Sequence, residues 1–327
     1  MLKRKTENQL FECNKKQNFS KLQERFLIPP FSIFDTKQGY WQQRKRTWLD
    51  LGIKSELGRG DNLLNYNEEE IKKNKFGKCL PASIGEAYGR KNMQATSIFD
   101  PVLCEICYRW FSNKDDLILD CFAGGSVRGI VASYLDRNYI GIDLRSEQIE
   151  ANNLNFKEIV AKKPIDYIPT WICGNSLNIK NLTNNKKVDL IFSCPPYYDL
   201  EIYSDLDGDI SNCETYKDFK KDYFKIIKET CDLLKEDRFA IFVVGEFRNK
   251  LGFYENFIGD TVTAFKEAGL QYYNEAILQT SIGTLPVRIT KQFNAGRKLG
   301  KTHQNILIFY KGNPKNIKNN YKDLIIE

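Results

Sequence analysis

The sequence predicts an α/β fold in which a mostly parallel sheet carries helices on both faces. Short apolar runs typical of buried strands alternate with longer helical patterns along the 327 residues, and this order is typical of a parallel sheet. Several of these runs end in glycine, proline or carboxylate residues, and ligands bind at such strand ends in open α/β folds. The chain is long enough for one such domain with appendages.

The N-terminal region is basic and rich in aromatic residues. Residues 28–35 predict an apolar segment that docks on the core, and residues 38–48 interleave aromatic with basic side chains. Such interleaving suits phosphate contact and base stacking, but it also fits an amphipathic helix packed on the core. We favour packing for Trp41 and Trp48, which stand seven residues apart. The expected outer face of this helix carries Arg44, Lys45 and Arg46.

A strand, loop and helix follow along the chain. Asp100-Pro101 is typical of a helix start, and we expect that helix to run to Phe111. Residues 115–120 then predict a strand, and small residues over 121–129 lead into another helical run. Small residues let the backbone pass close to a ligand, and the helix N-terminus faces it.

Two further strand ends carry polar side chains. The apolar run at 139–143 ends in Asp143, 23 residues beyond Asp120, which is the spacing at which an acid holds the ribose hydroxyls of an adenosine-containing ligand. The run at 171–174 precedes Asn175, whose amide oxygen can accept a hydrogen bond from an adenine amino group. A dinucleotide site would share the glycine loop and the acid, and Asn175 could equally be a turn residue.

The fourth strand end is the most informative. The apolar run at 188–192 stops at Cys194-Pro195-Pro196-Tyr197. Two prolines forbid further ladder pairing and force an exposed, stiff loop. Backbone carbonyls and a flat aromatic ring therefore come to the mouth of the sheet, although an ordinary Pro-Pro turn is the alternative.

The remaining elements complete the sheet. An acidic, turn-rich stretch at 199–212 predicts a lid, and a basic stretch poor in apolar residues occupies 283–301. Helices are expected over 216–234 and 260–269, and strands over 239–245, 276–278 and 304–310.

These strand ends resemble those of the amino-methyltransferases, which move a methyl group from S-adenosylmethionine to an exocyclic nitrogen of a DNA base. The family's glycine-loop pattern, Asp-Pro-Phe-Ala-Gly-Ser-Gly, is matched by Asp120, Phe122, Ala123, Gly124 and the later Gly129, whereas Cys121, Gly125 and Ser126 depart from it. The resemblance extends from Ile28 to about Gly312 and is to enzymes of phages and prophages. It implies a Rossmann-like S-adenosylmethionine-dependent methyltransferase fold, with a mostly parallel seven-stranded sheet and a C-terminal antiparallel hairpin.

The resemblance also implies S-adenosylmethionine as the cofactor. In the family, a segment upstream of the glycine loop closes over the methionine end of the cofactor, and Ser97 and Phe99 stand there in this sequence. The expected cofactor-binding residues are Ser97, Phe99, Asp120, Phe122, Ala123, Gly124, Gly125, Asp143 and Asn175.

The implied activity is site-specific methylation of adenine N6 or cytosine N4 in a base flipped out of the duplex. The expected catalytic residues are Cys194, Pro195, Pro196 and Tyr197. Tyr197 would stack on the base, while the Pro195 carbonyl and the side chain at position 194 accept the amino hydrogens. The family usually has Asp, Asn or Ser where Cys194 stands, and a thiol is a weak acceptor. Either the Pro195 carbonyl is the main acceptor of the amino hydrogens, or Ser193 or Asp199 assists. Because Cys194 is close to serine in size, it slightly favours cytosine N4 as the target without excluding adenine N6.

Three alternatives stay open. Pro-Pro-Tyr loops also serve RNA and protein-amide methyltransferases. Cys194 could instead attack C6 of a pyrimidine and give cytosine-C5 methylation, although those enzymes place their cysteine after Pro-Pro. A catalytically weak DNA-binding protein that kept the cofactor fold is the third alternative, because Ser126, Asn175 and Cys194 depart from the family pattern.

Positive charge gathers at the two ends of the chain. The net charge is +7; residues 1–78 carry 17 Lys and Arg against 10 Asp and Glu, and residues 286–327 carry 9 against 2, so the middle is acidic. Basic flanks fit a polyanionic partner, here DNA, although a codon bias toward Lys and Asn would give a similar excess. The C-terminal candidates for DNA contact are Arg288, Lys291, Arg297, Lys298 and Lys301.

We expect three regions: a basic N-terminal extension over 1–78, the catalytic domain over 79–312 and a tail over 313–327. The extension would pack on the core and contact DNA. A homodimer and a restriction or phage-modification partner are compatible with the resemblance.

Cysteine and histidine usage argues against a metal site. Nine cysteines without framework spacing indicate reduced thiols, and Cys104 and Cys107 are expected to face the core. The single histidine, His303, excludes a His-rich metal site and most His-based catalysis. No apolar run reaches the ~18 residues that span a membrane, and the N-terminus lacks an apolar signal core. We therefore expect a cytoplasmic protein with no membrane partner and no metal.

Overall fold

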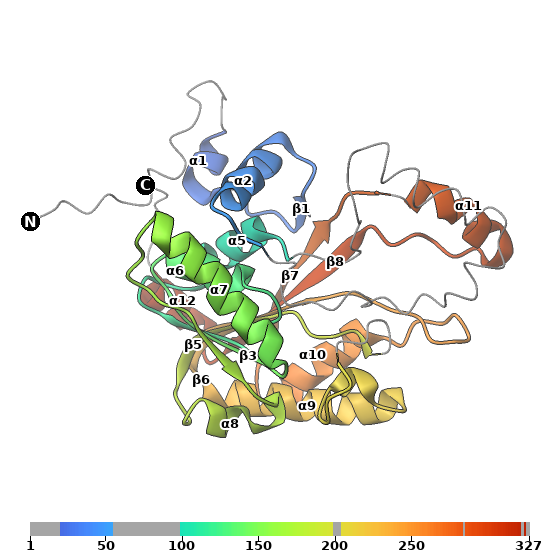
Figure 1. The fold of residues 1–327 in the computed structure, drawn as a ribbon. Helices are drawn as coiled ribbons and strands as arrows, with labels where there is room; N and C mark the ends of the chain where they lie inside the picture. The colour runs from blue at the N-terminus through green and yellow to red at the C-terminus, as the bar shows by residue number, and fades with distance from the viewer. Residues whose placement is uncertain (1–19, 55–98, 199–203, 284, 322–323, 325–327) are drawn as a thin grey trace, which may run out of the picture.

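The protein, described here by a computed structural model over residues 20–54, 99–198, 204–283, 285–321 and 324, folds as a sheet between two helical layers (Figure 1). Its eight strands lie in the order β1-β7-β8-β6-β5-β2-β3-β4. All pairings are parallel except those of β8, which runs antiparallel to β6 and β7. The strands are β1 (Ile33–Asp35), β2 (Leu117–Asp120), β3 (Asn138–Asp143), β4 (Thr170–Cys173), β5 (Val188–Ser193), β6 (Leu234–Val244), β7 (Gln271–Gln279) and β8 (His303–Lys311). The α-helices are α1 (Lys21–Phe26), α2 (Gly39–Asp50), α5 (Pro101–Phe111), α6 (Val127–Tyr134), α7 (Ser146–Lys162), α8 (Ile179–Leu182), α9 (Tyr216–Leu233), α10 (Phe257–Glu267), α11 (Leu285–Gly296) and α12 (Ile317–Asn320).

Alternate side chains of each central strand enter opposite layers, because successive residues of a strand point to opposite faces. In β5, Leu190 and Phe192 join a core cluster with α2, α5, α6 and α7, whereas Ile191 joins a second cluster with α8, α9 and α10. In Figure 1 the first group of helices lies above the sheet and the second below it. Burial on both faces explains why these strands appear as unbroken apolar runs in the sequence. The predicted α/β fold with a C-terminal antiparallel hairpin is confirmed.

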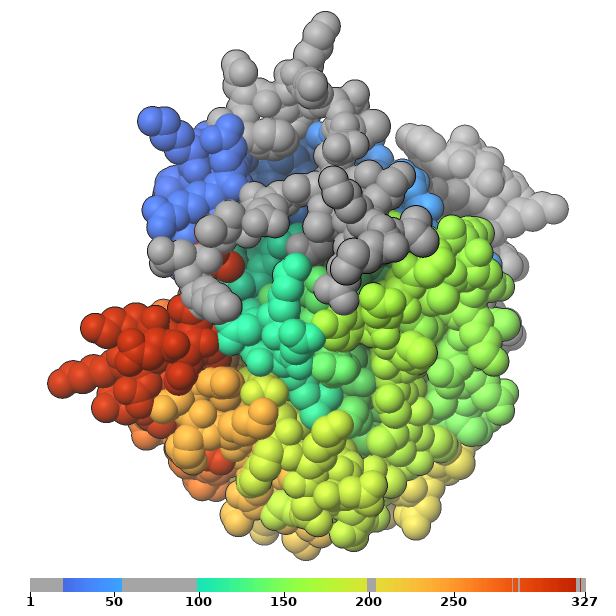
Figure 2. Space-filling view, turned by 90° about the vertical axis from the view of Figure 1, so that its left-hand side faces the viewer, coloured from blue at the N-terminus to red at the C-terminus, as the bar shows by residue number. Residues whose placement is uncertain are grey.

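The N-terminal segment is part of this body. β1 pairs in parallel with β7, with Ile33 opposite Ile277, so the sheet has one strand more than the seven that the resemblance implied. The segment at 28–35 was expected only to dock, but the edge of β7 offers it unpaired backbone groups. Trp41 and Trp48 are 0% and 1% exposed, which confirms that both pack on the core. Figure 2, seen from the side away from α11, shows this blue segment stacked on the green central layer.

The C-terminal residues also pack on the body. The Tyr321 ring lies 5.3 Å from that of Phe239 in β6, and the Asn113 side chain donates a hydrogen bond to the carbonyl of Asn320 (2.9 Å). The first part of the expected tail, as far as Tyr321, therefore contacts the sheet. The expected boundary between residues 78 and 79 lies outside the described residues.

Candidate active site

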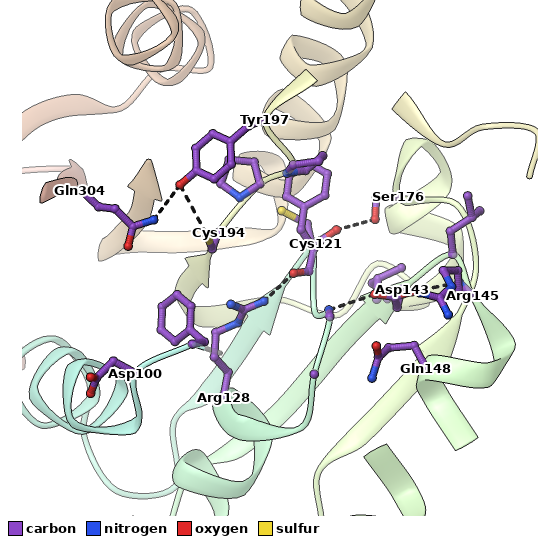
Figure 3. Close-up of a pocket in the computed structure, with 18 of the residues that line it drawn as sticks. Asp100, Cys121, Arg128, Asp143, Arg145, Gln148, Ser176, Cys194, Tyr197 and Gln304 are labelled. Carbon is purple, nitrogen blue, oxygen red and sulfur yellow. Dashed lines mark hydrogen bonds between the residues drawn. The ribbon is translucent and has the colours of Figure 1, made fainter. Parts of the chain in front are cut away.

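A cavity of about 350 Å³ opens at the carboxyl ends of the parallel strands. The ends of β2, β3, β4 and β5 all contribute to it, as their shared direction requires. Figure 3 shows Cys194 and Tyr197 on one side of the cavity and Asp143, Arg145 and Gln148 on the other. Residues predicted for the site that line the cavity are Phe99, Phe122, Gly124, Gly125, Asp143, Asn175, Cys194, Pro195, Pro196 and Tyr197.

The glycine loop is held open at Gly124. Its φ of +50° is a left-handed conformation that favours glycine, and a Cβ there would meet nothing within 4 Å. The Gly124 amide donates to Asp143 Oδ2 (2.9 Å), and its carbonyl accepts from the buried Asn152 side chain (2.7 Å). The backbone at Gly124 is therefore fixed on both sides while its face toward the cavity stays clear.

Asp143 is positioned by the backbone around it. Besides the bond from Gly124, its Oδ1 accepts from the Arg145 amide (3.0 Å). Burial raises the pKa of this carboxyl above its usual value, although the two backbone donors act in the opposite direction. Asp143 ends β3 at the cavity wall, so its carboxylate is placed to accept hydrogen bonds from ligand hydroxyls.

Asp120 supports the loop from beneath. It is 0% exposed, does not line the cavity, and accepts hydrogen bonds from Arg128 Nε (2.5 Å) and Tyr139 Oη (2.8 Å). Ala123 is also fully buried and away from the lining. The predicted contacts of Asp120 and Ala123 with a cofactor are therefore not supported by their positions, because both side chains belong to the layer under the loop.

Arg128 is a site residue that the sequence reasoning missed. Its Nη2 donates to the carbonyls of Phe122 (2.5 Å) and Ala123 (2.7 Å), and its guanidinium lies 4.6 Å from the centroid of the Phe99 ring. Burial acts to lower the pKa of Arg128, but the Asp120 carboxylate, together with Tyr139 and Cys194, raises it overall. One buried cation thus connects the glycine loop to Phe99. Only the order Asp-x₇-Arg in the sequence hinted at this pair.

The Pro-Pro loop follows Ser193, a buried residue whose side chain is hydrogen-bonded inside the fold. Ser193 Oγ donates to Asp120 Oδ1 (2.6 Å) and accepts from the Phe122 amide (3.1 Å). Ser193 is 0% exposed and cannot assist Cys194, which removes one of the two expected helpers. The other, Asp199, lies outside the described residues. Cys194 Sγ lies at the cavity wall, 4.0 Å from Tyr197 Oη.

Neighbouring elements hold the two tyrosines in place. Gln304 of β8 donates to Tyr197 Oη (2.9 Å), and the Tyr197 ring meets Phe257 edge-on at 6.0 Å. Tyr198 has a φ of +44°, which is unusual for an aromatic residue. Its ring packs 5.6 Å from that of Phe219, so Tyr198 lies half-buried against the core while Tyr197 lines the cavity. No local pattern in the sequence predicts this difference between the two tyrosines.

The segment at 204–212, expected to be a lid, covers one end of the cavity. Asn175 Oδ1 accepts from the Leu177 amide (2.9 Å) and so caps a short helical turn. A Cβ at Gly208, whose φ is +89°, would lie 2.1 Å from Asn175 Nδ2. Glycine is therefore required where the segment crosses Asn175.

The three basic residues of α2 have different surroundings. Arg44 pairs with the fully buried Glu105 of α5, so it is not on the outer face as predicted. Lys45 Nζ lies 2.9 Å from Asp100 Oδ2, and Lys45 lines the cavity. Only Arg46 is exposed. The contact between α2 and α5 thus brings an N-terminal cation to the cavity, which sequence spacing could not reveal.

The C-terminal basic residues lie on a projecting arm, defined here as residues 280–302. Lys291, Arg297 and Lys298 are exposed, and Lys301 is partly buried. Burial lowers the pKa of Lys301, and its ammonium lies 5.9 Å from the Tyr254 ring. Arg288 falls within α11, and its side chain is outside the described atoms. The arm extends beyond the body on the side of the strands' carboxyl ends (Figure 1).

Two kinds of feature are absent from the described part of the chain. No group of three or more His, Cys, Asp or Glu side chains there could hold a metal ion. None of its helices combines the length and the apolar character needed to cross a membrane.

Cys104 and Cys107 are 0% and 1% exposed, as expected of core residues.

Comparison with known proteins identifies the family. The model of the DNA methylase family (N6_N4_Mtase) matches residues 5–154 and 188–326. Two type II methyltransferases of Moraxella bovis, M1.MboII and M2.MboI, are 46% and 48% identical over 54 and 48 residues, which are 16% and 15% of this chain. The matched stretch spans only 20% and 18% of those relatives.

Among solved structures, a methyltransferase from Pyrococcus furiosus aligns with a TM-score of 0.43 and 15% identity, over 71% of this chain and 94% of that one. A structure described as a DNA modification methylase of Thermus thermophilus aligns with a TM-score of 0.33 and 16% identity, over 43% of this chain and 51% of that one. The family model covers most of the sequence, including both the glycine loop and the Pro-Pro-Tyr loop, and the chain therefore belongs to the DNA methylase family.

Proposed function

We propose that this protein transfers a methyl group from S-adenosylmethionine to the exocyclic amino group of adenine or cytosine in DNA. The observation that carries the proposal is the continuity of one cavity from Asp143 and the glycine loop to Cys194 and Tyr197. A cofactor held at one end would reach a base stacked at the other. The family match supports amino transfer over the cytosine-C5 alternative.

The residues present fit S-adenosylmethionine. A cavity of about 350 Å³ lies within the usual range for small-ligand sites, roughly 300–1,000 Å³. Gly124 leaves open space beside the Asp143 carboxylate, which would accept the two ribose hydroxyls. Lys45 and Arg128 place positive charge near Phe99, where a methionine carboxylate would be stabilised. When bound, the cofactor supplies an electrophilic sulfonium methyl group.

The chain's own residues would prepare the amino group for attack. Tyr197, fixed by Gln304, offers a ring on which a flipped base can stack. The Pro195 carbonyl and Cys194 would accept the amino hydrogens, and this directs the nitrogen lone pair toward the methyl group. Transfer would form the N–C bond as the S–C bond of the cofactor breaks, with the electron pair kept by sulfur and one proton of the amino group released to water. Because the Ser193 hydroxyl is hydrogen-bonded to Asp120, the Pro195 carbonyl would be the main acceptor of the amino hydrogens.

The arm would bind the DNA backbone. Residues 280–302 contain five Lys and Arg and no Asp or Glu, and most of α11 is exposed. A 12-residue helix without a packed face is marginally stable in water, so contact with phosphates would stabilise it. Arg46 would add a contact from α2. A homodimer and a restriction partner stay predictions of the resemblance.

Mass spectrometry of nucleosides tests the proposal directly. DNA is incubated with the purified protein and S-adenosylmethionine carrying a deuterated methyl group, then digested. Labelled N6-methyladenine or N4-methylcytosine is the expected product, and its identity fixes the target base. Labelled 5-methylcytosine would instead make Cys194 a nucleophile. Labelled RNA with unlabelled DNA, or no label with cofactor binding intact, would contradict the proposal.

A further inference from the structure

A small hairpin projects between β6 and α10, below α11 in Figure 1. It spans residues 248–254, with an antiparallel bridge between Arg248 and Tyr254. Asn249 closes it: its amide donates to the Phe253 carbonyl (2.8 Å), and its Oδ1 accepts from the amides of Leu251 and Phe253 (3.1 Å each). These bonds fix the direction in which the tip points.

The tip of this hairpin is apolar. Leu251 is 83% exposed, more than any other large apolar side chain in the described residues, and Phe253 is 69% exposed. Single exposed apolar residues are common on protein surfaces. Two of them, two positions apart on a closed turn, form an apolar wedge, because the turn bonds fix the backbone that carries both side chains.

Cations surround the wedge. The Arg248 guanidinium lies 3.9 Å from the centroid of the Tyr254 ring, and the Lys301 ammonium lies 5.9 Å from it. Lys298 of the arm reaches the hairpin at Gly252, where a Cβ would lie 2.6 Å from its Nζ. Lys250 is exposed beside the tip. DNA has charged phosphates on the outside and stacked bases inside. An apolar tip surrounded by positive charge therefore suits DNA.

The base of the hairpin adjoins the Pro-Pro-Tyr loop. Gly245 follows β6, and a Cβ there would lie 3.7 Å from the Tyr197 ring and 3.9 Å from Lys301 Cε. The Glu246 carboxylate accepts from the amides of Phe257 (3.2 Å) and Ile258 (2.9 Å), which ties the two ends of the hairpin segment together. Leu251 stands six positions beyond Gly245, so the tip lies within about 20 Å of Gly245.

We propose that residues 248–254 insert Leu251 and Phe253 between base pairs next to the target nucleotide and so stabilise the flipped-out state. The inference rests on the proposed methylation of DNA. Extruding a base disrupts stacking, and proteins that deform DNA often place apolar side chains between base steps. Arg248, Lys250 and Lys298 would hold the neighbouring phosphates while the two apolar side chains occupy the disrupted step.

The test compares the double variant L251A/F253A with I168A. Ile168 is a matched control because it is 72% exposed and precedes β4, at the opposite edge of the sheet from the cavity. The substrate is a duplex carrying the sequence that the wild-type protein methylates. Single-turnover rates are measured on the paired duplex and on one in which the target base is mispaired, and the fluorescence of 2-aminopurine at the target position reports extrusion.

We expect the double variant to bind S-adenosylmethionine as the wild type does and to methylate the paired duplex at least tenfold more slowly, with little 2-aminopurine signal. The mispaired duplex should restore most of the rate, because extruding a mispaired base costs less. I168A should behave as the wild type. Equal rates for wild type and double variant, or an equal loss on both duplexes, would overturn the wedge. A wild-type protein that methylates no DNA would instead overturn the proposed function itself.

Discussion

Cys194 is the residue at which this chain departs most from the pattern it resembles. Its thiol lies 4.0 Å from Tyr197 Oη and is a weak hydrogen-bond acceptor, while the neighbouring Ser193 hydroxyl is buried and hydrogen-bonded to Asp120 and Phe122. The structure thus leaves the Pro195 carbonyl as the stronger acceptor for an amino group at this loop.

The Cys194→Ala variant should therefore lose activity only modestly. We expect kcat to fall about tenfold, less than the 10²–10³ typical when a strong donor of an oxyanion hole is removed, with the affinity for S-adenosylmethionine unchanged. Cys194→Ser, which restores a hydroxyl acceptor, should match or exceed the wild-type rate. The measurement is single-turnover methylation of DNA. Complete loss of turnover in both variants would indicate that the thiol acts as a nucleophile.

Asp143 should control cofactor affinity. Replacing it by Asn removes a charged acceptor, and hydrogen bonds to charged groups contribute about 1.5–3 kcal/mol. We expect the dissociation constant for S-adenosylmethionine to rise about 10- to 100-fold in titration calorimetry, with Glu147→Gln, exposed on the first turn of α7, as the control. Because the pKa of Asp143 is raised by burial, wild-type affinity should begin to fall in acid at a higher pH than an ordinary aspartate would give. Unchanged affinity in the Asn variant would remove Asp143 from the cofactor site.

Residues at strand ends can be predicted from the sequence, whereas residues that act through contacts between distant strands cannot. Asp143 and Cys194 can be predicted because each ends an apolar run, so local pattern alone brings them to the mouth of the sheet. The roles of Asp120 and Ser193 depend on a contact between β2 and β5, which lie about 70 residues apart in the chain. No local pattern encodes such contacts.

At the scale of elements, the contact between α2 and α5 attaches the N-terminal segment to the rest of the fold. Glu105 of α5 is fully buried and accepts hydrogen bonds from Arg44, from Arg109 Nε (2.9 Å) and from Trp48 Nε1 (2.8 Å). Burial acts to raise the pKa of this carboxyl, but Arg44, Arg109 and the hydrogen bond from Trp48 together outweigh it, and the pKa falls to about 2. The ionised carboxylate therefore stabilises the folded state.

Stability should depend on pH through this carboxylate. A depressed pKa contributes stability that is complete above the unfolded value, about 4.3, and is lost as the pH falls toward 2. The full contribution is on the order of 3 kcal/mol, since each pKa unit corresponds to about 1.4 kcal/mol. Urea unfolding of wild type and Glu105→Gln between pH 5 and pH 3 should show a steeper loss in the wild type. Parallel curves would mean that Glu105 contributes nothing to the acid sensitivity.

The elements that were predicted well and those that were missed differ in what stabilises them. α9 and β5 carry a continuous apolar face or run, and their ranges agree with expectation to within a residue or two. β1 has three residues and exists because β7 offers it an edge, and α11 lies in a stretch without a buried face. Elements that depend on a partner rather than on their own hydrophobic pattern could not be predicted from the sequence.

At the scale of the whole molecule, the fold places the cavity and the basic arm at the same edge of the sheet. The parallel strands bring the glycine loop, Asp143 and the Pro-Pro-Tyr loop to their carboxyl ends, and the antiparallel pair β7 and β8 extends the arm beyond the same edge (Figure 1). The acidic middle of the sequence forms the body, while the basic residues of the arm project from it. DNA is therefore expected to approach from the arm's side.

The triple variant K291A/R297A/K298A tests this orientation. Each phosphate contact contributes about −0.9 to the slope of log K against log salt concentration, so the slope should become shallower by up to about 3 units. Phosphate contacts carry no sequence information, and affinity for specific and nonspecific duplexes should fall by similar factors. The matched control is K162A/K186A/K228A, three exposed lysines near the amino ends of the strands, which removes the same charge from the opposite edge. If affinity and salt dependence fall equally in both triple variants, net charge rather than the arm governs binding. If they fall only in the arm variant, DNA lies across the carboxyl edge of the sheet, above the cavity that Tyr197 lines.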